Sequence, residues 1–179
     1  MTFYHSGALA DIPPATVSTP SQPVFEPLPP VSSSDVVSFV EYLDSHGGQG
    51  DVFVLAHEFG KEFSDLINIV KVAEMLDFID TPKQRTVLTP LGHRFADMDT
   101  EDQKVVWKQQ ILTLSIFKTI HADVQASRNG TMLDDDVQDR LAQLLPNENP
   151  TFTFETFINW ARFGNLLAFD DDSDEVSLQ

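Results

Sequence analysis

The chain contains no cysteine, so disulfides, thiolate nucleophiles and thiolate metal sites are excluded. It has no apolar run long enough to span a bilayer, and residues 1–10 contain no Lys or Arg, so neither a membrane span nor an export signal is indicated. We therefore expect a cytoplasmic protein. The phosphate-binding pattern Gly-x-x-x-x-Gly-Lys-Ser/Thr is also missing, and no Lys-Ser/Thr pair follows the one glycine cluster, Gly47–Gly50. The chain is not expected to bind ATP by itself.

Basic residues are scarce as well. Only 11 Lys and Arg stand against 28 Asp and Glu in 179 residues, which gives a formal net charge of −17 at pH 7. Nucleic-acid binding and adsorption to an anionic membrane both depend on cations that neutralise phosphates, so both are disfavoured. A basic protein partner would be attracted, although solubility alone is a sufficient reason for an acidic surface.

The sequence also lacks catalytic and metal-binding patterns. The five histidines have no second His or Cys at ligand spacing: His5, His46, His57, His93 and His121. Asp170, Asp172 and Asp174 alternate as at the start of a calcium loop, but Glu175 stands where such a loop needs glycine. No Gly-x-Ser-x-Gly nucleophile elbow is present. We therefore predict no enzyme, no metal site and no cofactor.

Residues 1–33 contain seven of the 11 prolines and show no helical periodicity. Because proline lacks the N–H that helices and inner strands need, we expect a disordered or extended leader. A proline-motif docking site at Pro27-Leu28-Pro29-Pro30 is the alternative interpretation of this stretch.

Residues 34–98 follow an order of helices and then a hairpin. Apolar spacing predicts a helix after Ser34 that ends at Gly47-Gly48, a short strand at Val52-Phe53 that enters a second helix, and a third helix capped by Ser64. The predicted hairpin comprises Phe78-Ile79, a turn at 81–84, and Arg85–Leu88. Thr89-Pro90 then has the cap and first-turn residues of another helix.

Residues 99–179 repeat this plan without repeating the sequence. Capping-box spacing from Thr100 predicts a helical region that runs to about Ser127, with a bend at 113–115 and a break at Asn129-Gly130. Two more helices are expected at about 134–145 and 152–164. Leu166–Phe169 and Glu175–Leu178 flank an acidic turn and are expected to form a second hairpin.

The predicted fold is mostly α with small β-hairpins, arranged as two winged-helix-like lobes at 34–98 and 99–179. A plain helical bundle fits the periodicity too. In a winged helix the third helix enters the DNA major groove, and here that helix is Ser64–Leu76, with Lys71 as its one cation. A transcription regulator is therefore retained as the alternative function.

Three motifs in order carry a family resemblance over about Ser34–Leu178. They are Ala73-Glu74-Met75-Leu76-Asp77-Phe78, Leu88-Thr89-Pro90-Leu91-Gly92 with Arg94-Phe95-Ala96, and Asn159-Trp160-Ala161-Arg162-Phe163. Together they resemble the AAA-associated C-terminal domain that follows the ATPase of nitrate-, sulfonate- and taurine-type ABC importers. Asp77 and Ala161 stand where that family commonly has glycine, and the chain itself has no ATPase domain.

The resemblance implies a non-enzymatic accessory or regulatory module whose partner is the ATPase or permease subunit of an ABC importer. We name Arg162, Arg94 and His93 as possible interface residues, because they lie in or beside these motifs. Trp160 and Arg162 point about 200° apart on a helix. If Trp160 faces the core, Arg162 is exposed near the helix end and close in sequence to the acidic turn 170–174.

Overall fold

The computed structural model describes residues 25–179, which form eight α-helices and two three-stranded antiparallel sheets. The helices are α1 (Ser33–Ser45), α2 (Val52–Phe59), α3 (Phe63–Met75), α4 (Pro90–Ala96), α5 (Thr100–Ile111), α6 (Ser115–Ala126), α7 (Asp134–Leu144) and α8 (Pro150–Phe163). The strands are β1 (Gln49–Asp51), β2 (Ile79–Asp80), β3 (Arg85–Leu88), β4 (Thr131–Leu133), β5 (Leu167–Asp170) and β6 (Glu175–Leu178). The prediction of a mostly helical fold with small hairpins is confirmed.

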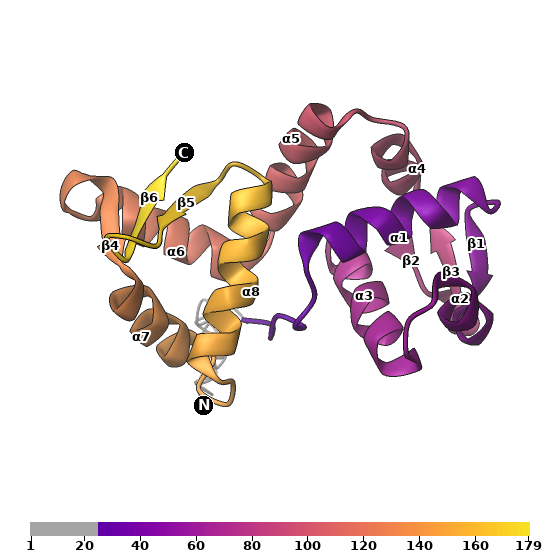
Figure 1. Cartoon of the computed structure of the whole chain (residues 1–179), viewed down its shortest axis with the longest axis horizontal. Coiled ribbons are helices and arrows are strands. Elements are labelled where there is room, and N and C mark those ends of the chain that lie inside the picture. The colour runs from indigo at the N-terminus through magenta and orange to yellow at the C-terminus, as the bar shows by residue number, and fades with distance from the viewer. Residues whose placement is uncertain (1–24) are drawn as a thin grey trace, which may run out of the picture.

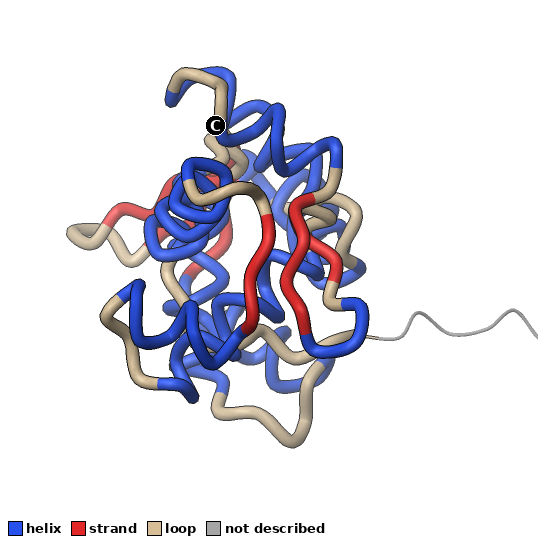
Figure 2. Tube along the Cα trace, turned by 90° about the vertical axis from the view of Figure 1, so that its right-hand side faces the viewer, coloured by secondary structure: helices blue, strands red, loops and turns tan. Residues whose placement is uncertain are grey.

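The elements form two lobes that lie side by side (Figure 1). Lobe 1 contains α1 to α4 and the sheet β1-β3-β2, and lobe 2 contains α5 to α8 and the sheet β4-β6-β5. Figure 2, turned so that lobe 1 faces the viewer, shows its short strands flanked by helices. In each lobe a helix, a strand, two helices and a hairpin follow one another.

The two sheets repeat each other in register. Gln49 pairs with Val87 in lobe 1, and Thr131 pairs with Ser177 in lobe 2. Residues of β4 are numbered 82 above their counterparts in β1, and residues of β6 are numbered 90 above their counterparts in β3. The same two differences hold for all three residue pairs that join β1 to β3 and β4 to β6. Because a slip of one residue would turn every side chain to the other face, this agreement identifies a structural repeat.

The repeat extends through the ends of α3 and α8. Asp77 and Asn165, 88 residues apart, both adopt the left-handed conformation, with φ of 59° and 49°. The following amides, of Phe78 and Leu166, each donate to the carbonyl five residues earlier at 2.9 Å. Asp and Asn tolerate positive φ better than most residues, and this explains how Asp77 can stand in the usual place of glycine.

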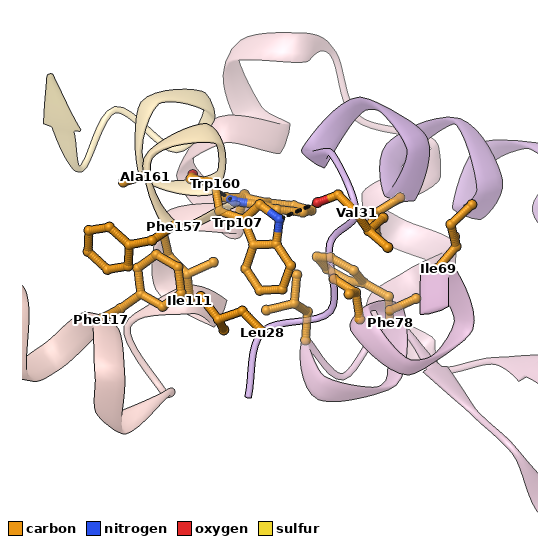
Figure 3. Close-up of a cluster of buried hydrophobic side chains, with 14 of the residues drawn as sticks. Leu28, Val31, Ile69, Phe78, Trp107, Ile111, Phe117, Phe157, Trp160 and Ala161 are labelled. Atoms are coloured by element: carbon orange, nitrogen blue, oxygen red, sulfur yellow. Dashed lines mark hydrogen bonds between the residues drawn. The ribbon is translucent and has the colours of Figure 1, made fainter. Parts of the chain in front are cut away.

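A single apolar core crosses the boundary between the lobes (Figure 3). Trp107 of α5 lies 6.2 Å from Phe78 of lobe 1 and 6.1 Å from Trp160 of α8, measured between ring centroids. Its indole N–H donates to the Trp160 carbonyl at 3.1 Å. Phe117 of α6 stacks on Trp160 at 5.9 Å. Both tryptophans are fully buried, so the lobes are joined by packed aromatic rings as well as by the chain.

The segment 25–33 differs from the predicted leader. Leu28 and Val31 are buried in the common core, and the indole N–H of Trp160 donates to the Val31 carbonyl at 2.7 Å. The expectation of a disordered or extended leader covered residues 1–33. Its part at 1–24 lies outside the described residues, whereas residues 25–33 are packed against both lobes because Leu28 and Val31 fill the junction between them.

Several element boundaries were predicted wrongly. The first strand is Gln49–Asp51 and not Val52-Phe53, because the Asp51 carboxylate accepts from the Phe53 amide at 2.9 Å and starts α2. Helix α3 begins at Phe63, ahead of the predicted cap Ser64, and the Phe63 ring stacks on Phe53. Strand β4 was not predicted, since three residues are too few to show alternation. By contrast, Thr89 does cap α4, accepting from the Gly92 amide at 2.9 Å.

Candidate interaction surfaces

His93 and Arg94 lie on α4 of lobe 1, where His93 has a structural contact. Its Nδ1 lies 2.6 Å from a carboxylate oxygen of Asp44, the residue in α1 that comes after the buried Leu43. A Cβ added at Gly48 would come within 2.7 Å of the His93 ring, so this glycine lets α4 approach the loop after α1. Arg94 is exposed on the same helix. Whether either residue meets a partner stays a prediction.

Arg162 lies on α8 of lobe 2, so the three predicted interface residues do not line one groove. The side chain of Arg162 is exposed while Trp160 is fully buried, which confirms the predicted opposition of the two faces. Among residues 25–179, no ion pair joins Arg162 to the acidic turn 170–174. That turn is instead closed on itself by a bond from the Asp172 amide to the Asp170 carboxylate, and this bond lowers the pKa of Asp170.

Arg162 lines a groove of about 570 Å³ along the outer face of α8, which we call the α8 groove. Four of its eight lining residues are apolar: Phe154, Ile158, Phe163 and Phe169. Its polar groups are Arg162, Glu155, Asn159 and Ser33. The side-chain oxygen Oδ1 of Asn159 accepts from the Ser33 backbone amide at 2.7 Å, so the start of α1 closes one end of the groove. A guanidinium among apolar walls suits a segment with apolar and acidic side chains.

A second groove, of about 380 Å³, lies between α2 and α3 and is called the α3 groove. Its apolar wall comprises Val52, Phe53, Phe63, Ile67 and Val70. Phe53 and Phe63 stack with ring centroids 4.5 Å apart and remain 66% and 41% exposed. Glu74 and Thr81 close the far end, where the Thr81 hydroxyl donates to the Glu74 carboxylate at 2.6 Å. Such an exposed apolar patch is typical of an interaction site.

The structural repeat makes the two grooves equivalent. Residues of α8 are numbered 88 above their counterparts in α3, so Glu74 corresponds to Arg162, Lys71 to Asn159 and Val70 to Ile158. The same face of the repeated unit is therefore hollowed in both lobes, but the charge at its end is reversed.

The described residues contain no group of three or more His, Cys, Asp or Glu side chains placed to hold a metal ion. No helix in the described range is long and apolar enough to cross a bilayer. Every buried side-chain nitrogen or oxygen in residues 25–179 has a hydrogen-bond partner. No buried polar atom in this range is therefore left to receive a ligand, and binding area is offered by surface hollows such as the two grooves.

Residues 53–170 match the family described as the C-terminal AAA-associated domain. The chain belongs to this family. The match spans both lobes and all three motifs, and it links this AAA-associated domain to an ATPase in general terms. No curated protein and no solved structure matches the chain.

Sequence reasoning missed the α3 groove of this AAA-associated domain. Phe53 was assigned to a strand and Phe63 to the loop before a helix, so neither was considered as surface. A signal was present, because Phe63 and Ile67 are apolar residues one helical turn apart on α3, outside its buried face. The wall contributed by α2 could not be found in this way, since it depends on the packing of two helices.

Proposed function

We propose that the protein is a non-enzymatic accessory module that binds and regulates the ATPase of an ABC importer of the nitrate, sulfonate or taurine type, on the cytoplasmic side of the membrane. The observation that carries this proposal is the match of residues 53–170 to the AAA-associated family. The two apolar grooves support it, because each offers a place for a protein segment. Within this proposal Arg162 lies at the partner contact, with Arg94 and His93 as further interface residues.

The direct test is capture of the partner from native lysate of the source cells, with the full chain as bait. The full chain is needed because Leu28 and Val31 are part of the core. Recovery of an importer ATPase or permease subunit, identified by mass spectrometry, is the expected result. Arg162→Ala should recover less of that subunit, whereas Arg128→Ala, which removes a cation elsewhere on lobe 2, should recover as much as the parent chain. Capture of neither subunit would refute the transporter proposal.

A winged-helix transcription regulator remains the alternative, and the element order of lobe 1 favours it. Its weakness is charge. Helix α3 would enter the DNA groove, but its residues Phe63 and Ile67 are apolar, and its one cation, Lys71, lies one turn from Glu74. Phosphate contacts need several cations, so we expect no retention on mixed duplex DNA at physiological salt. Retention under those conditions would favour the alternative.

A further inference from the structure

The face of α8 that corresponds to the α3 groove is covered in lobe 2 by a segment of the chain itself. In lobe 2, residues Pro30–Ser33 lie along α8 beside Phe152 and Glu155. Their backbone is held there by Asn159 and Trp160, which bond to Ser33 and Val31. This face of the repeated unit therefore already binds a polypeptide segment in lobe 2.

In lobe 1 the corresponding face is open on its α2 side, while on its other side residues 26–30 line a separate hollow with Lys71 and Glu74. Lys71 occupies the place of Asn159, and Phe53 and Phe63 leave a stacked aromatic surface exposed beside it. From Phe63 to Glu74 the groove follows α3 for about 16 Å, which is three helical turns. A helix laid in a groove of this length places anchors at i, i+4 and i+7 against it.

The charges beside the α3 groove select the kind of helix. Glu74 is fixed at one end by Thr81, and Asp51 caps α2 directly before the groove residues Val52 and Phe53. Glu62 is exposed and precedes Phe63 without making a cap hydrogen bond. Against these three carboxylates stand Lys71 in the groove, Arg85 opposite Asp51 on β3, and Lys61 next to Glu62. The excess of negative charge therefore comes from the chain as a whole, whose net charge is −17. A second copy of this chain would be repelled, whereas a cationic segment would be attracted.

We propose that the α3 groove is a docking site for an amphipathic helix of a partner protein, with apolar side chains against Phe53, Phe63 and Ile67 and a Lys or Arg paired with Glu74. The partner is the ATPase if the function proposed above is correct, but the chemistry of the α3 groove does not depend on that.

The first experiment measures binding of a synthetic amphipathic helix to the full chain by titration calorimetry at physiological salt. The probe has Leu at i, i+4 and i+7 and Lys at the flanking positions. We expect the double variant Phe53→Ala/Phe63→Ala to weaken binding about tenfold or more, as for central aromatic contacts. Phe152→Ala is the matched control, because Phe152 is 64% exposed on lobe 2, and it should bind like the parent chain. Circular dichroism verifies that each variant is folded.

The second experiment tests the charge. Glu74→Lys should weaken binding of the Lys probe and strengthen binding of a second probe in which Glu replaces Lys. The parent chain should bind the Lys probe more tightly than the Glu probe. Amide chemical shifts should change along α2 and α3.

Four outcomes would overturn the proposal. The first is that the Lys probe does not bind the parent chain, and the second is that the Phe53/Phe63 and Phe152 variants lose probe affinity equally. The third is that Glu74→Lys changes the affinity for neither probe. The fourth is that the parent chain sediments as a dimer and the Phe53/Phe63 variant as a monomer. None of these concerns the ATPase, so they are distinct from a failure to capture it.

Discussion

Truncation of Trp160 tests how the two lobes are joined. The Trp160 side chain is fully buried, stacks on Phe117, meets Trp107 edge to face, and donates to the Val31 carbonyl at 2.7 Å. Trp160→Ala removes these contacts and leaves a cavity between the lobes and the segment before α1. Substitutions of this kind cost about 3–5 kcal/mol. The loss of a partner for the buried Val31 carbonyl is included in that range.

Two further variants separate the contributions. Trp160→Phe keeps an aromatic ring but removes the N–H donor, so we expect an intermediate loss of about 1–3 kcal/mol. Arg162→Ala, two residues along the same helix, removes an exposed cation with no ion pair among the described residues, and should cost less than about 1 kcal/mol. Arg162 therefore serves as the control on the same helix.

The measurement is urea unfolding followed by far-ultraviolet circular dichroism, because removal of Trp160 leaves Trp107 as the one tryptophan for fluorescence. With an m-value of about 2 kcal/mol/M, a loss of 4 kcal/mol lowers the midpoint by about 2 M. Equal midpoints for Trp160→Ala and Arg162→Ala would refute the assignment of Trp160 to the core. Two separate transitions in the parent chain would refute the inference that one core joins the lobes.

Three other changes have definite expected outcomes. Gly92→Ala should destabilise the protein by about 1–3 kcal/mol in urea although alanine favours helices, because its Cβ would lie 2.0 Å from the Phe78 carbonyl oxygen; a stabilised variant would contradict this. Leu28→Ala should lower the free energy of unfolding by about 2–3 kcal/mol, since Leu28 is buried in the common core, whereas a disordered leader would give no change. The hydrogen bond from Lys61 lowers the pKa of Asp35, so this pair stabilises the folded protein above about pH 4, and the stabilisation is lost as the pH falls through the lowered pKa. The difference in unfolding free energy between the parent chain and Lys61→Met should therefore shrink from pH 7 to pH 3. A constant difference would refute the linkage.

The local signals in the sequence were sufficient for most elements. Apolar spacing placed the helices, Thr89 and Pro90 started α4, and Asn129-Gly130 marked the break after α6. These features succeed because capping and turn conformations depend on residues a few positions apart. The same locality explains the failures at Ser64 and at β4, because α3 begins at Phe63 without a side-chain cap and β4 forms by pairing with the distant strand β6.

The sequence by itself determined the acidic charge, the absence of a phosphate-loop motif and of cysteine, the order of helices and hairpins, and three family motifs. These depend only on composition and on short-range pattern. The tertiary structure decided that the segment 25–33 is part of the core and that both lobes repeat one register. It also decided that Glu74 and Arg162 occupy equivalent positions in two grooves. Residues 88 positions apart with opposite charges show no likeness in sequence, because only the packing of their helices makes them correspond.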